Sequence, residues 1–148
     1  MKKIIFTLIM LINLNTINAA NENTILESLG FISATKVMVT AYGLGSAYDA
    51  WITDAYNDEE FEDVVLFYQQ AITGTREQLN TLYRYGDLLY DDKEYIAELI
   101  EIYDALHEQS RTALKYSYTK KDLDFNAYTN ARSSTIDKMN NLFELNWE

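Results

Sequence analysis

The 148-residue chain contains no cysteine and no proline, and it has only five glycines and one histidine. The lack of cysteine excludes disulfides, thiolate metal sites, cysteine nucleophiles and lipid attachment through a cysteine. The lack of proline favours a helical protein, because sheets and long loops commonly use proline at turns and edges. We therefore expect an all-α protein that is held together by packing alone.

Basic side chains are also scarce, with 12 Lys and Arg against 23 Asp and Glu. Two of the lysines lie within the segment 1–20, so the segment 21–148 carries 10 basic and 23 acidic side chains, a net charge of −13. Such a charge repels phosphates, which argues against nucleic acid and against anionic membrane surfaces, and we expect no nucleic-acid partner. A basic partner would suit it, although a solvated acidic surface is the commoner reason for this composition.

The segment 1–20 has the three parts of a secretory signal peptide. A lysine pair precedes an apolar run over residues 4–12, and small residues, Ala19 and Ala20, follow a short polar stretch. The run is well short of the roughly 20 residues that span a bilayer. We expect a signal peptide over 1–20, cleaved after Ala19 or Ala20, and a single domain over 21–148 that is periplasmic or secreted and keeps no stable membrane anchor.

Four helix starts recur along that domain. An N-cap residue followed three positions later by an acid satisfies free backbone N–H groups and complements the helix dipole. This pattern begins at Thr24, Asn57, Asp91 and Thr119, which divide the domain into segments of comparable length. The spacing predicts four helices of similar length.

Uncharged residues between these starts recur in alternating steps of four and three, as in a heptad seam. The seams are Gly30, Ala34, Val37, Ala41, Leu44, Tyr48, Trp51 and Ala55; then Phe61, Val65, Tyr68, Ile72, Thr75, Leu79, Leu82, Gly86 and Leu89; then Ile96, Leu99, Tyr103, Leu106, Ser110 and Ala113. The fourth segment is less regular, because Arg132 interrupts a face that holds Phe125, Tyr128, Thr135, Met139 and Leu142. The pattern predicts an up-down-up-down four-helix bundle with short connections.

That topology places an acidic group and a basic group at one end of the bundle. The acids are Asp54, Asp58, Glu59, Glu60, Glu62 and Asp63, and the bases are Arg111, Lys115, Lys120 and Lys121. We interpret them as complementary patches on adjacent turns that fix the pairing order, with a docking site for a charged partner as the alternative.

No residue set in the chain points to chemistry. His107 is the only histidine, so it cannot supply the two histidines of a di-iron bundle, and it is typical of a rim residue. Gly43 and Gly45 lie inside a helical pattern without a preceding strand, which indicates close packing or a kink and not a phosphate loop. We expect no enzyme activity, no metal and no cofactor.

Two features favour binding instead. Four tyrosines, Tyr83, Tyr85, Tyr90 and Tyr95, crowd the second connection, and the topology brings Trp147 near them; tyrosine and tryptophan suit interfaces, although a tyrosine-rich core is the commoner explanation. The first helix has a second apolar face that includes Leu29, Ile32 and Val39. A helix that is apolar all round is central in the bundle, forms a homodimer or partner interface, or enters a membrane.

These features predict an exported, non-enzymatic protein that acts by protein–protein binding. The alternatives are an immunity or inhibitor protein against an envelope-acting toxin or enzyme, and a carrier of a ligand, metal or haem in the bundle interior, with His107 as the ligand. Each is an analogy between folds, and a fold does not determine a function.

Overall fold

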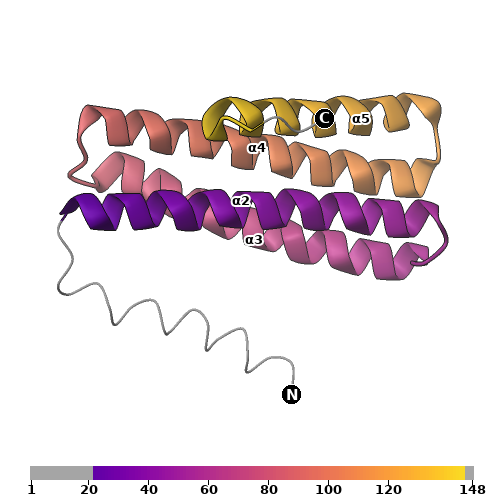
Figure 1. Cartoon of the computed structure of the whole chain (residues 1–148). Coiled ribbons are helices and arrows are strands. Elements are labelled where there is room, and N and C mark those ends of the chain that lie inside the picture. The colour runs from indigo at the N-terminus through magenta and orange to yellow at the C-terminus, as the bar shows by residue number, and fades with distance from the viewer. Residues whose placement is uncertain (1–21, 146–148) are drawn as a thin grey trace, which may run out of the picture. The chain divides into compact units, whose positions relative to one another are not determined.

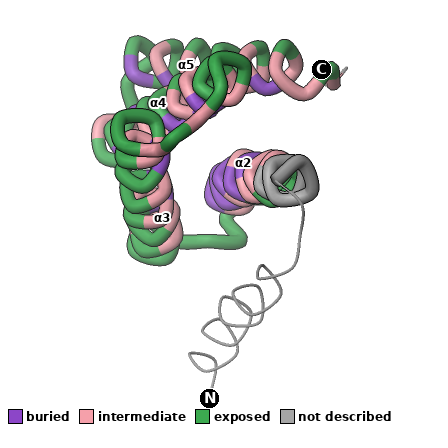
Figure 2. The backbone as a smooth tube through the Cα atoms, turned by 90° about the vertical axis from the view of Figure 1, so that its left-hand side faces the viewer, coloured by how far each residue is buried: buried purple, intermediate pink, exposed green. Residues whose placement is uncertain are grey.

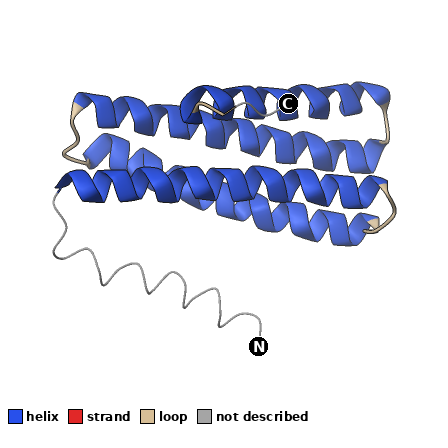
Figure 3. Ribbon diagram, in the orientation of Figure 1, coloured by secondary structure: helices blue, strands red, loops and turns tan. Residues whose placement is uncertain are grey.

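The computed structural model describes the backbone of residues 22–145 and the side chains of residues 30–145. This part of the chain forms four helices joined by short connections and contains no strand (Figures 1 and 3). The helices are α2 (Glu22–Ile52), α3 (Asp58–Tyr85), α4 (Tyr90–Thr119) and α5 (Asp122–Phe143). The prediction of an all-α, four-helix protein is confirmed, whereas the predicted signal peptide lies outside the described residues.

The contacts of the described residues divide them into two units at position 35, and the second unit, from residue 36 onward, is compact. The second unit contains residues 36–52 of α2 and the whole of α3, α4 and α5. Within it, each helix runs opposite to the one before it (Figure 1). Helix α4 packs against both α3 and α5, which lie on either side of it when the helices are seen end on (Figure 2).

The predicted start of α3 is confirmed in atomic detail. The Asn57 side chain accepts a hydrogen bond from the Glu60 backbone N–H at 2.9 Å, and the Glu60 carboxylate accepts one from the Asn57 N–H at 3.0 Å. The pair forms a complete capping box. Acidic residues at the next two positions complement the helix dipole.

The other three predicted caps are wrong. Helix α2 is already formed at Glu22, the first described residue, so Thr24 lies inside it. Helix α4 is capped by Leu89 without a side-chain hydrogen bond, which puts Asp91 in its first turn. Thr119 is the last residue of α4. An acid near a helix start stabilises the dipole from several positions, so the pattern locates the turn and not the cap itself.

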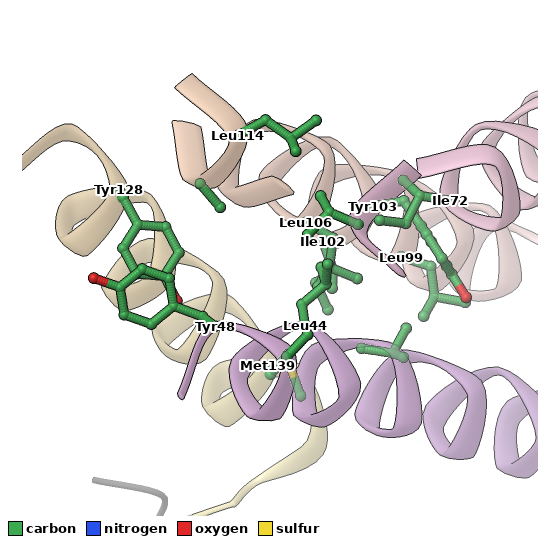
Figure 4. Close-up of a cluster of buried hydrophobic side chains, with 14 of the residues drawn as sticks. Leu44, Tyr48, Ile72, Leu99, Ile102, Tyr103, Leu106, Leu114, Tyr128 and Met139 are labelled. Atoms are coloured by element: carbon green, nitrogen blue, oxygen red, sulfur yellow. The ribbon is translucent and has the colours of Figure 1, made fainter. Parts of the chain in front are cut away.

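The predicted seams supply most of the core (Figure 4). Every seam residue of α4 is buried. The seams of α2 and α3 alternate between buried residues such as Leu44 and Ile72 and half-buried ones such as Ala41 and Tyr68. The seams fail at their ends, where Ala55 and Leu89 are exposed. Burial of a continuous apolar seam is the main favourable contribution to stability in a protein without disulfides.

Helix α4, and not the first helix, is the central element. It packs against both α3 and α5, and it has buried residues outside its predicted seam, including Ile102, Gln109 and Thr112. Within the second unit, the second apolar face of α2 is open, since Val39 is 61% and Tyr42 76% exposed. A central position for the first helix is therefore wrong, and partner contact remains as a hypothesis for this face.

Both glycines of the Gly43–Gly45 pair make room for a side chain from another helix. A Cβ atom at Gly43 would lie 2.0 Å from the Tyr68 hydroxyl of α3. A Cβ atom at Gly45 would lie 3.2 Å from a guanidinium nitrogen of Arg132 in α5. What lies close at both glycines is therefore a side chain against the α2 backbone, and not the closely packed neighbouring helix that the sequence suggested.

Candidate functional site

The connection between α3 and α4 presents large side chains to solvent. Tyr83 is 42%, Tyr85 82%, Leu89 74% and Tyr90 79% exposed. We call these four residues the aromatic turn. Tyr85 and Tyr90 are the two most exposed large hydrophobic residues in the described part of the chain.

A tight backbone turn holds these residues in place. The Gly86 N–H donates to the Leu82 carbonyl oxygen at 2.8 Å and closes α3. A Cβ atom at Gly86 would lie 2.5 Å from that same oxygen, so only glycine fits here without a backbone shift. Leu82 and Leu88 pack against the core on either side of the turn. The aromatic turn is therefore anchored by two half-buried leucines that contact the core.

The remaining predicted site residues are in different environments. Tyr95 packs against the core, and its burial raises the pKa of its phenol. Ile32 is 48% exposed and Val39 is 61% exposed on α2. The side chains of Leu29 and Trp147 lie outside the described residues. Three of the four tyrosines named from the sequence are therefore exposed, whereas Tyr95 packs against the core.

At the far end of α4, Trp51, Asp58 and Lys120 join three helices. The Trp51 indole N–H donates to Asp58 Oδ1 at 2.7 Å, and the Lys120 ammonium donates to the same oxygen at 2.9 Å. The ammonium also lies 3.9 Å from the centre of the Trp51 ring, a cation–π geometry. These hydrogen bonds, first from Lys120 and then from Trp51, lower the pKa of Asp58. Because the three groups satisfy one another, we interpret them as a structural link.

This link bears out only part of the predicted pairing between the acidic and basic groups. Lys120 does reach Asp58 across the two turns. Lys115 instead pairs with the buried Asp124 at 2.6 Å, and Arg111 pairs with Glu108 on its own helix. The difference arises because i,i+3 neighbours and the adjacent helix start lie closer to these two bases than α3 does.

A groove of about 250 Å³ lies between α2 and α5, with Gln109 of α4 contributing to its lining. Arg132 and Asp49 face each other across it, their nearest charged atoms 3.6 Å apart. Sequence reasoning missed this site. The signal available in the sequence was Arg132, a charged residue that interrupts the apolar face of its own helix.

His107 is half-buried on α4. Among the residues that the structure describes, no three histidine or carboxylate side chains converge on a point where a metal ion could bind. No described helix is both long enough and apolar enough to cross a bilayer.

No protein-family model, curated protein or solved structure matches this chain. The geometry of its own residues is therefore the basis for assigning a function.

Proposed function

We propose that this chain is an exported, non-enzymatic protein that binds another protein, in the cell envelope or outside the cell, through the aromatic turn. The observation that carries the proposal is the exposure of Tyr85 and Tyr90, at 82% and 79%. Tyrosine offers a large contact area at a low cost in side-chain entropy and brings a polar hydroxyl, which is why interfaces are enriched in it.

The rigidity of the turn supports this role. Gly86 and the half-buried leucines beside it, which pack against the core, hold the backbone before any partner arrives. A surface that is already ordered loses less conformational entropy on binding, so more of the contact energy appears as affinity. The aromatic turn therefore resembles a preorganised binding surface more than a flexible loop.

Charge indicates the kind of partner. The segment 84–94 around the turn contains four acidic and two basic side chains, and the whole chain has a net charge of −11. Electrostatic complementarity increases the rate of association and excludes partners of like charge. We therefore expect a partner that surrounds an apolar pocket with lysine or arginine.

Export rests on the segment 1–20. Its charged start, apolar run and small terminal residues favour cleavage by a signal peptidase. The mass of the intact protein recovered outside the cytoplasm would test this directly. A mass that lacks residues 1–19 or 1–20 supports export, and retention of the full chain inside the cell contradicts it.

The binding surface can be tested by placing a photo-crosslinking amino acid at position 85 and, as the matched control, at position 118. Tyr118 is also an exposed tyrosine, at 63%, but it lies at the opposite end of α4. We expect a specific protein adduct from position 85 only.

The affinity of the purified pair would then be measured by calorimetry. Because interface hot spots contribute about 2 kcal/mol or more, the double variant Tyr85→Ser, Tyr90→Ser should weaken binding about 30-fold, and Tyr118→Ser should not. Equal losses for the two variants, or crosslinking from position 118 alone, would show that the aromatic turn is not the binding surface.

A further inference from the structure

The groove between α2 and α5 is a second candidate site, at a distance along α4 from the aromatic turn. Helix α2 lines it with Tyr42, Gly45 and Asp49, and α5 lines it with Arg132. Gln109, from the central helix, completes the lining. All of these residues belong to the second unit, so the groove is formed within one compact body.

Gln109 is the first reason to expect a ligand. Its side chain is only 2% exposed, and its Oε1 atom is buried without a hydrogen-bond partner among the described residues. Buried polar atoms are nearly always hydrogen-bonded, so an exception needs an explanation. A carboxamide offers an acceptor and two donors, and rotation about its last side-chain bond exchanges them. A polar ligand in the groove can satisfy this group in either orientation.

The neighbouring hydroxyls do not satisfy Gln109, because they bond to backbone carbonyls of their own helices. Thr135 donates to the Ala131 carbonyl at 3.0 Å, and Thr112 donates to the carbonyls of Glu108 and Gln109. The Gln109 Oε1 atom therefore receives no hydrogen bond from these hydroxyls, and a donor bound in the groove can supply one.

The charged pair at the groove is the second reason. Arg132 and Asp49 are separated by 3.6 Å, the longest ion pair in the described part of the chain, whereas the others span 2.5–2.9 Å. Both side chains are partly open to solvent, at 37% and 58% exposure. A guanidinium presents five donors in a plane, a geometry that matches a carboxylate. A loose, accessible ion pair can therefore accept an anionic and a cationic group from one molecule.

Gly45 fixes the position of the guanidinium. A Cβ atom there would lie 3.2 Å from one Arg132 nitrogen, so the missing side chain allows Arg132 to lie against the α2 backbone. By contrast, a Cβ atom at Gly74, which is also inside a helix, would have no neighbour within 4 Å. The glycine at position 45 therefore has a local role that glycine at position 74 does not have.

We propose that this groove binds a small zwitterion, of the class of a free α-amino acid. Its carboxylate binds Arg132, its ammonium group binds Asp49, and its polar atoms satisfy Gln109. The volume of about 250 Å³ suits a molecule of this size, since pockets for drug-sized ligands occupy about 300–1,000 Å³. A zwitterion also avoids the repulsion that a simple anion would meet from a protein of net charge −11.

The test is calorimetric titration of the purified protein with a panel of the standard free amino acids, with acetate and ethylammonium as single-charge probes. We expect at least one amino acid to bind with a Kd of about 1 mM or tighter, and each single-charge probe to bind at least tenfold more weakly. Binding of none of the amino acids would show that the groove holds only water and would overturn the proposal. If acetate binds as tightly as the best amino acid, the ammonium group contributes nothing, and the proposal of a zwitterionic ligand is overturned.

Variants distinguish this groove from other charged surfaces. Asp49→Asn and Arg132→Gln should each weaken binding at least tenfold, and Gly45→Ala should weaken it because it displaces the guanidinium. The controls are Arg76→Gln, which breaks an exposed ion pair with Asp104 on another face, and Gly74→Ala. Asp49 is more than half exposed, so its variant is not expected to impair folding. Unchanged binding in Asp49→Asn and Arg132→Gln would place the ligand elsewhere.

Discussion

Gly43 of α2 lies directly beneath the phenol ring of Tyr68 from α3, which makes it a sensitive probe of how α2 packs. In the Gly43→Ala variant, the new Cβ atom would lie 2.0 Å from the Tyr68 hydroxyl oxygen and 2.4 Å from the ring carbon that carries it. Neither distance is possible between non-bonded atoms, so the Tyr68 side chain must leave its position or the helices must separate.

The magnitude follows from two opposing effects. Alanine in place of glycine inside a helix stabilises by about 0.5–1 kcal/mol, because the unfolded chain loses conformational freedom. Overpacking of a filled contact destabilises by about 1–3 kcal/mol. We expect Gly43→Ala to lower the free energy of unfolding by about 0.5–2 kcal/mol.

Gly74→Ala is the matched control. Gly74 lies inside α3 with nothing within 4 Å of its virtual Cβ, so only the helix-forming effect applies. This variant should raise the free energy of unfolding by about 0.5–1 kcal/mol. Urea unfolding followed by circular dichroism, with unchanged slopes in denaturant, would measure both differences.

A double variant makes the test specific to the contact. In a Tyr68→Ala background there is no ring to displace, so Gly43→Ala should stabilise as much as Gly74→Ala does. The resulting coupling energy between positions 43 and 68 should be about 1–3 kcal/mol. If Gly43→Ala alone is as stabilising as Gly74→Ala, the packing of α2 against Tyr68 is wrong.

Three further predictions concern the helix cap and the buried titratable groups. Asn57→Ala removes the capping box of α3 and should destabilise by about 1 kcal/mol in urea unfolding, more than the same change at the exposed Asn126. Hydrogen bonds from Lys115 and Thr119 lower the pKa of Asp124, so its contribution to stability is present above the ordinary carboxyl range and is lost as pH falls through the lowered pKa; unfolding measured against pH should be less acid-sensitive in Asp124→Asn. Burial raises the pKa of Tyr103 to about 12. The contribution of the neutral phenol to stability is therefore fully present below the ordinary tyrosine pKa, and it is lost as the pH rises through the raised pKa. Tyr103→Phe should remove one late-titrating phenol from an ultraviolet titration and leave stability unchanged or up to about 1 kcal/mol higher, because the buried hydroxyl has no hydrogen-bond partner among the described residues. A loss of more than about 1 kcal/mol would indicate a hydrogen bond at that hydroxyl, for which Thr75, whose own hydroxyl donates to the Ala71 carbonyl, is the nearest candidate.

The helices and their buried faces could be predicted from the sequence because both depend on local order along the chain. A seam such as Leu99, Tyr103 and Leu106 lies on one side of any helix, whatever that helix packs against. The capping box at Asn57 is equally local, since all its atoms lie between Asn57 and Glu60. The proline-free composition and the spacing of the helix starts then sufficed for an all-α, four-helix protein.

The tertiary structure decided which helix is central, because that depends on how faces from distant segments pair. The sequence of α2 is apolar on two faces, yet α4 is the helix that packs against two others. The same holds for the groove. Arg132 is a defect in its own helical pattern and becomes a site only when α2 brings Asp49 and Gly45 to it and α4 supplies Gln109. Periodicity specifies the faces of each helix, but only packing determines which side chains meet and which polar atom is left without a partner.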